Sequence, residues 1–242
     1  KEFSILVAND MHSLSSSLED QSCPNSKNKE SCTVPPYKYG KINLNTPLSL
    51  VSLMFTHMQK QLESPDILVL LGDFPAHLYA QDPKSQYKPE IFAELKKTIN
   101  LVTEQAKIHF PNTAFLPVLG NNDFKYNYQV PMYNEKEEYY EFFYRICFEE
   151  HEPNKNWKDL ENIKTTFLTG GFYAVDLENN LRVIVLNTMY YAKSNKEARD
   201  PKTTLMQLKW FERKMQEAKE MNMQVVLIYQ VFPGYCYTTP LV

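Results

Sequence analysis

Short, continuously apolar runs that each end in polar residues are the feature that most constrains the fold of this chain. These runs are residues 3–8, 67–71, 115–119, 181–186 and 225–229. Apolar runs of this length are typical of strands buried on both faces, as in parallel sheets. The sequence therefore predicts strands at the centre of a layered structure.

Longer segments between these runs carry helical signals. Residues 48–62, 89–110 and 203–221 place apolar side chains at helical spacing, and the charged, aromatic-rich span 134–151 predicts a helix over the sheet. Residues 172–176 and 181–186 flank a turn-forming segment and predict a hairpin. Strands that alternate with helices indicate an α/β layered domain. No repeat or compositional boundary interrupts residues 1–242, so we expect one domain.

Composition and charge exclude several classes of protein. Hydrophobic residues make up 43% of the 242 residues, which argues against disorder. The chain carries 26 Lys and Arg against 29 Asp and Glu, so it has no basic surplus for binding a phosphate backbone. No apolar run approaches the roughly 20 residues that a membrane-spanning helix requires. We therefore expect neither nucleic-acid binding nor a transmembrane segment.

Three of the predicted strands end in polar residues of related chemistry. Asp10 and His12 follow the first run, Asp73 and His77 follow the second, and Asn121 follows the third. The carboxyl ends of strands in an α/β sheet meet at one crevice, so Asp10, His12, Asp73 and Asn121 are expected to converge. Oxygen and imidazole groups of this kind bind Mn, Zn or Fe. Where two metal ions are paired, one carboxylate bridges them, and Asp73 is the natural candidate.

Glycine is scarce, with six among 242 residues, so individual glycines are informative. Gly72 and Gly120 directly precede candidate ligands. We expect that a side chain at either position would crowd the turn.

The order Asp-x-His, then Gly-Asp-x-x-x-His, then Gly-Asn-x-Asp resembles the calcineurin-like metallophosphoesterases, and more narrowly the acid sphingomyelinase-like phosphodiesterases. Further matching stretches run in order along nearly the whole chain: Pro-Pro-Tyr (35–37), Asn-Thr-Pro-Leu-Ser-Leu (45–50), Gly-Asp-Phe-Pro-Ala-His (72–77), Gly-Gly-Phe-Tyr (170–173), Leu-Asn-Thr-Met-Tyr-Tyr (186–191) and Val-Phe-Pro-Gly-Tyr (231–235). The resemblance implies an αββα layered sandwich. It implies Asp10, His12, Asp73 and Asn121 as metal ligands, and His77 as a phosphate-side group; an ordinary hydrogen-bonded loop histidine is an equal alternative for His77.

The chain departs from the family pattern at two positions inside the site. Asn122 stands where the family has a His that donates a proton or contacts phosphate, and a carboxamide cannot release a proton at pH 7. Loss of a general acid typically costs about 10²–10⁴ in rate. Gln230 stands where the family has a metal-ligating His, and its carboxamide oxygen is a poorer ligand for a transition metal than imidazole.

The family also closes its site with a Gly-His-x-His segment, and no histidine of this chain lies after His151. We therefore expect that the C-terminal part of the fold is missing here. Uncovered apolar sheet surface usually marks an interface, so a protein partner is expected to cover the incomplete sheet.

The favoured interpretation is a catalytically inactive pseudoenzyme that acts as a structural or interaction subunit, with no catalytic residue and no cofactor. The first alternative is a metal-dependent phosphodiesterase in which Asp10, His12 and Asp73 hold one Zn, Mn or Fe ion. The second is a module that binds a phosphorylated ligand without cleaving it, through His77 and the asparagine pair 121–122. The uncompensated carboxylates beside that pair argue against the second alternative because they repel an anion.

The cysteines bear on the compartment. Cys23 and Cys32 flank a polar stretch expected to form a surface loop, and a disulfide between them would imply an oxidising compartment; two free thiols are the alternative. The family resemblance implies a secretory, luminal or extracellular location. The absence of any Asn-x-Ser/Thr sequon weighs mildly against one.

Overall fold

The computed structural model describes residues 3–13, 39, 45–77, 89–126, 128–131, 135–196 and 199–232. Strands β1 (Ile5–Ala8), β2 (Ile67–Leu70) and β3 (Ala114–Pro117) form a first sheet in that order, and both pairs are parallel. Every residue of β2 is buried, as expected for a central strand covered on both faces. Strand β3 ends two residues before the predicted run does, at Pro117, which has no N–H for the ladder.

A second sheet contains the remaining strands, β4 (Tyr173–Leu177), β5 (Leu181–Val185) and β6 (Gln224–Ile228). Strands β4 and β5 pair antiparallel, which confirms the predicted hairpin, while β6 pairs parallel to β5. Asn179 and Asn180 form the turn with φ values of 61° and 54°, a left-handed conformation that asparagine tolerates well. The sheet is therefore mixed rather than purely parallel.

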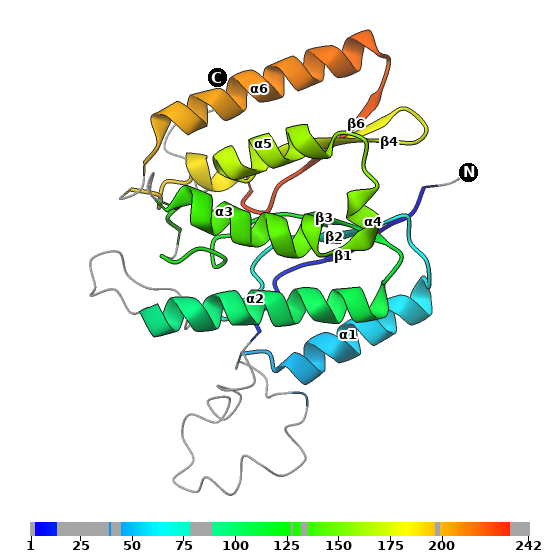
Figure 1. Ribbon diagram of the computed structural model, residues 1–242, viewed down its shortest axis with the longest axis vertical. Coiled ribbons are helices and arrows are strands. Elements are labelled where there is room, and N and C mark those ends of the chain that lie inside the picture. Colours follow the sequence, from blue (N-terminus) through cyan, green and yellow to red (C-terminus); the bar gives the residue numbers. More distant parts are fainter. Residues whose placement is uncertain are drawn as a thin grey trace, which may run out of the picture.

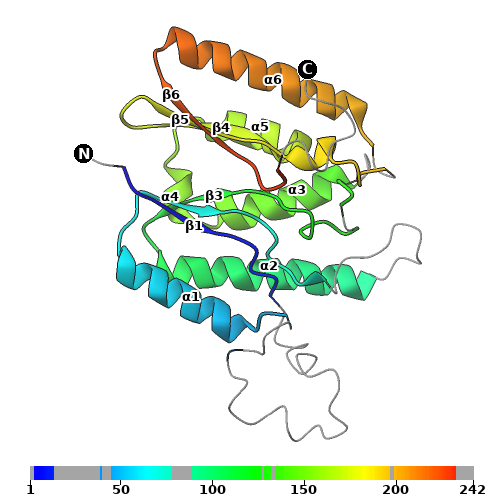
Figure 2. The same cartoon turned by 180° about the vertical axis from the view of Figure 1, so that it is seen from behind.

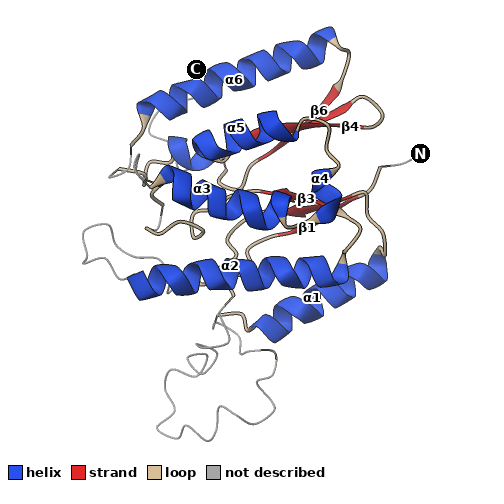
Figure 3. Ribbon diagram, viewed as in Figure 1, coloured by secondary structure: helices blue, strands red, loops and turns tan. Residues whose placement is uncertain are grey.

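Helices cover the outer faces of both sheets. Helices α1 (Leu48–Gln61) and α2 (Pro89–His109) lie on the side of the first sheet, and α6 (Pro201–Glu220) lies on the side of the second (Figures 1 and 2). The main hydrophobic core joins α1 and α2 to residues of both sheets, whereas Trp210 of α6 packs in a smaller cluster with Phe172 and Ile184. Figure 3 shows the strands enclosed between these helices. This is the αββα order that the family resemblance implied.

The aromatic-rich span folds as predicted into a helix, α3 (Lys136–Tyr144), which continues as the π-helix η4 (Arg145–Glu149). Tyr139, Tyr140 and Phe143 are buried on it, so these aromatic side chains form core and not an exposed contact surface. The short helix α4 (Glu152–Lys155), the helix α5 (Leu160–Gly170) and the 3-10 helix η5 (Thr188–Tyr191) were not predicted from the apolar pattern.

Two further predictions concern cysteines and membranes. The proposed Cys23–Cys32 disulfide lies outside the described residues, and Cys147 is a buried free thiol. Among the helices that the structure describes, each is too short or too polar to cross a bilayer.

Candidate metal centre

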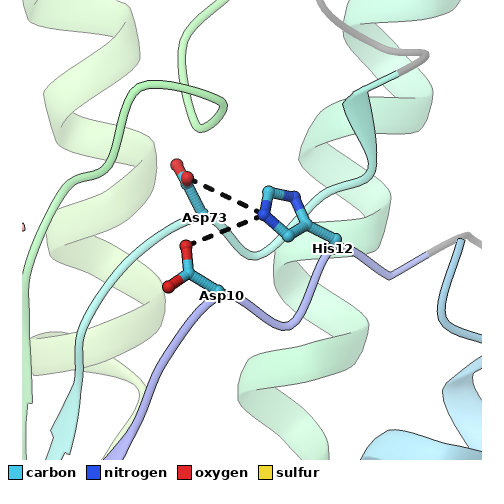
Figure 4. Close-up of side chains that lie close together, drawn as sticks. All are labelled: Asp10, His12 and Asp73. Atoms are coloured by element: carbon cyan, nitrogen blue, oxygen red, sulfur yellow. Dashed lines mark ion pairs between the residues drawn. The ribbon is translucent and has the colours of Figure 1, made fainter. Parts of the chain in front are cut away.

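Three side chains meet where β1 and β2 end. Asp10 and His12 follow β1, and Asp73 follows β2; the two strand ends are neighbours because the strands pair in parallel. One ligand atom from each residue lies within 4.8 Å of the other two. His12 Nε2 is 3.7 Å from Asp10 Oδ1 and 3.9 Å from Asp73 Oδ2 (Figure 4). The predicted convergence of these residues is therefore observed.

The backbone at all three positions is strained. Asp10, His12 and Asp73 adopt φ values of 49°, 42° and 52°, which L-residues other than glycine seldom do. Backbone hydrogen bonds hold the two segments together: His12 N–H donates to the Asp73 carbonyl at 3.0 Å, and Ser13 N–H to that of Phe74 at 2.8 Å. Such strain persists only where the surrounding structure imposes it, and it concentrates at functional sites.

Two glycines make room for Asp73. A Cβ on Gly120 would lie 2.2 Å from Asp73 Oδ1 and 2.7 Å from its backbone nitrogen. Gly72 has a φ of 75°, and a Cβ there would lie 2.5 Å from the backbone nitrogen of Gly120. The prediction that side chains would crowd these turns is confirmed.

The His12 ring is oriented with one nitrogen toward the carboxylates. Its Nδ1 lies 3.4 Å from the Pro75 carbonyl oxygen, and its Nε2 faces Asp10 and Asp73. Metal-ligating histidines are commonly oriented by such a hydrogen bond to a carbonyl. His77 stacks on His12, with ring centroids 4.3 Å apart and planes inclined by 17°.

The two residues that depart from the family pattern both contact Asp73. Asn122 donates its backbone N–H to Asp73 Oδ1 at 2.8 Å and its Nδ2 to Oδ2 at 3.1 Å. Gln230 donates its Nε2 to the same Oδ2, also at 3.1 Å. Burial raises the pKa of Asp73, and the Asn122 bonds and the nearby His12 partly offset this.

Asp123 supports the turn from inside the core. Its fully buried carboxylate accepts backbone N–H groups of Asp73 at 2.9 Å, Phe74 at 2.9 Å and Gly120 at 2.7 Å. Burial, reinforced by the charge of Asp73, raises the pKa of Asp123 to about 7 in spite of these bonds. No role was predicted for Asp123, although it ends the Gly-Asn-x-Asp motif. Asn121 is buried in the same turn, where its carbonyl accepts Tyr128 N–H at 3.3 Å.

These residues fit one divalent transition-metal ion. Asp10, His12 and Asp73 supply two carboxylates and an imidazole nitrogen from one small volume. Beside them, Asn122 Oδ1 and Gln230 Oε1 are buried and accept no hydrogen bond within the described part of the chain, which is uncommon for carboxamide oxygens. A bound ion would supply positive charge to this acidic cluster, and its chemistry is to polarise a phosphoryl group or activate water. The roles of Asn121 and His77 toward such an ion or its substrate stay predictions.

Comparison with known proteins shows the family. A model of the calcineurin-like phosphoesterase family matches residues 3–239, so the chain belongs to that family. It is 27% identical over 199 residues to sphingomyelinase phosphodiesterase D of Dictyostelium discoideum, covering 81% of this chain and 40% of the relative. It is 26% identical over 215 residues to cyclic GMP-AMP phosphodiesterase SMPDL3A of Bos taurus, covering 88% and 44%. It is 26% identical over 223 residues to human acid sphingomyelinase-like phosphodiesterase 3b, covering 89% and 44%.

The chain therefore spans about two fifths of the length of the curated relatives it matches. For this reason nothing about the centre is concluded from the absence of a Gly-His-x-His segment in residues 1–242. Asn122 and Gln230 do bear on it, because both lie within the matched residues and both touch Asp73.

Proposed function

We propose that this chain is a catalytically inactive metallophosphoesterase-like domain that serves as a structural or interaction subunit. The observation that carries the proposal is a pair of hydrogen bonds to Asp73 Oδ2. The side-chain amides of Asn122 and Gln230 each donate to this oxygen at 3.1 Å. A carboxylate oxygen offers about two lone-pair sites, so the two N–H donors compete with a metal ion for Asp73 Oδ2. Neutral amide donors thus take the place of the metal charge beside Asp73.

Proton transfer gives independent support. The side-chain amide of Asn122 lies 3.1 Å from Asp73 Oδ2, inside the site, but cannot act as a general acid. Even with a metal ion bound, the loss of that step is expected to lower turnover about 10²–10⁴-fold.

An interaction role accords with the exposed apolar side chains on the second sheet and its covering helix. Leu205 and Met215 of α6 are 53% and 41% exposed, and Leu227 of β6 is 40% exposed. We assign these exposed apolar side chains to contacts with a protein partner. We also propose a secretory or luminal location, which a Cys23–Cys32 disulfide found by mass spectrometry of the purified chain would support and free thiols there would contradict.

The alternative is a metal-dependent phosphodiesterase with a reduced, one-metal site. It is favoured by the ligand atoms of Asp10, His12 and Asp73 within 4.8 Å and by the orientation of His12 Nε2 toward the two carboxylates. The names of the relatives suggest a phosphodiester substrate, such as a cyclic dinucleotide or sphingomyelin.

One pair of measurements on the natively purified chain separates the two proposals. Elemental analysis gives Mn, Fe, Zn and Ca per chain, and hydrolysis of bis(4-nitrophenyl) phosphate is followed with and without added Mn²⁺ or Zn²⁺. We expect trace metal and no turnover above that of Asp73→Ala. Turnover that Asp73→Ala abolishes would refute the inactive domain, and one ion per chain together with such turnover would establish the alternative.

A further inference from the structure

A second cavity lies away from the metal centre. It has a volume of about 580 Å³ between α5 and α6, against β4, and none of its lining residues belongs to the Asp10, His12 and Asp73 cluster. Figure 1 shows α5 and α6 as neighbouring helices on the side of the second sheet. Its volume falls within the roughly 300–1,000 Å³ typical of sites for small organic ligands.

Both tryptophans of the chain, Trp157 and Trp210, line this cavity. Trp210 is 7% exposed and packs against Phe172, with ring centroids 4.9 Å apart. Trp157 meets Phe148 edge-on at 5.8 Å. Each indole is therefore braced by a buried phenylalanine, and the part of each that lines the cavity offers fixed aromatic surface against which a planar ring can pack.

One basic residue of the cavity is structural. Arg182 is 4% exposed, and its guanidinium forms two bonds to Asp176, at 2.6 and 2.7 Å, and one to the Lys214 carbonyl at 2.9 Å. Lys214 in turn pairs with Glu217 at 2.8 Å. These contacts join β4 and β5 to α6 and build the wall of the cavity, and they leave no free charge for a ligand.

Two other cations are available. Lys158, just before α5, lines the cavity and forms no ion pair within the described residues. Arg213 of α6 is 66% exposed at its side chain and has one long contact, 3.7 Å, to Glu217. The two come from different walls of the cavity. Asp159 and Asp176 also line it, so its lining holds four basic and two acidic side chains, an excess of positive charge in a chain whose net charge is −3.

We propose that this cavity binds a small organic anion that carries an aromatic ring. The ring lies against Trp157 and Trp210, and the phosphate or carboxylate of the ligand pairs with Lys158 and Arg213. The inference is independent of what the metal centre does, because the two sites share no residue.

Intrinsic fluorescence reports directly on this cavity because the only two tryptophans line it. The probe is adenosine 5′-monophosphate, titrated in the presence of EDTA so that neither metal-dependent hydrolysis nor a metal-bridged complex contributes. We expect saturable quenching by adenosine 5′-monophosphate. Adenosine, which lacks the phosphate, and ribose 5-phosphate, which lacks the base, are each expected to bind at least about tenfold more weakly. Absence of saturable quenching up to about 1 mM, or equal quenching by adenosine, overturns the proposal.

Variants locate the bound anion. Lys158→Gln and Arg213→Gln are each expected to weaken binding about tenfold, because each removes one charge-assisted contact. Both are near the surface, so circular dichroism is expected to show an intact fold. Lys219→Gln removes an exposed charge at the far end of α6, outside the cavity, and serves as the matched control with unchanged affinity. Equal affinity in all three variants would place the ligand elsewhere and refute the assignment.

Discussion

Gln230→His tests whether the metal centre lacks only a ligand. The Gln230 Nε2 lies 3.1 Å from Asp73 Oδ2, so the side chain at this position already reaches the centre. An imidazole Nε2 stands the same number of bonds from Cα as the amide nitrogen of glutamine. The substitution therefore replaces a donor that occupies Asp73 with a lone pair directed at the same volume.

The magnitude follows from the ligand count. Asp10, His12 and Asp73 offer three ligand atoms within 4.8 Å, and the new imidazole supplies the fourth that a tetrahedral Zn²⁺ site requires. Substitution of a residue that only orients a metal ligand typically changes metal affinity about 10–100-fold. Gln230→His adds a ligand, so we expect it to raise the Zn²⁺ affinity by about 100-fold, the upper end of that range. At saturating metal this corresponds to roughly 2.7 kcal/mol of added unfolding free energy, or about 5–11 °C in Tm.

Isothermal titration with Zn²⁺ and thermal unfolding with and without Zn²⁺ measure this effect. Gln224→His places the same substitution at the exposed first residue of β6, so it controls for an added surface histidine. Gln230→His is expected to bind one ion per chain with a metal-dependent rise in Tm, and Gln224→His is not. If Gln230→His folds normally but binds Zn²⁺ no better than the unaltered chain, the ligand geometry described here is wrong.

Three further predictions concern the scaffold. Asp200 caps the N-terminus of α6 and pairs with the buried ammonium of Lys136. Lys136→Met removes that partner, so urea unfolding is expected to show that the free energy of unfolding falls by about 3–5 kcal/mol. A fall below about 1 kcal/mol would mean that the pair contributes little to stability. Burial lowers the pKa of His151, so its contribution to stability is present above about pH 6.5 and is lost as the pH falls. The unfolding free energy should therefore decrease between about pH 7 and pH 5, and less so in His151→Gln, while the exposed-site control His57→Gln keeps the full slope. Gly120→Ala forces a Cβ to within 2.2 Å of the Asp73 carboxylate and should destabilise the chain by roughly 1–3 kcal/mol; an unchanged melting curve would contradict this packing.

The local patterns of the sequence predicted the elements that carry strong periodic signals. The buried strand β2 and the amphipathic helices α1, α2 and α6 lie within one or two residues of their predicted bounds. Helix α5 was missed because few of its 11 residues are buried: Ile163, Phe167 and the terminal Gly170. Two buried apolar side chains give too weak a periodic signal. Its helical state depends on packing against α3 and β4, which no local pattern encodes.

The sequence by itself determined that Asp10, His12 and Asp73 would meet, because parallel strands bring their carboxyl ends to one edge and each residue directly follows such a strand. Only the tertiary structure decided which side chains form hydrogen bonds with Asp73. Gln230 reaches it across 157 positions of sequence, through the crossover that places β6 beside β5, and such a contact depends on the packing of the whole domain. The cavity that Trp157 and Trp210 line has the same origin, since it exists only because α5 and α6, which residues 171–200 separate in sequence, come to lie over one sheet.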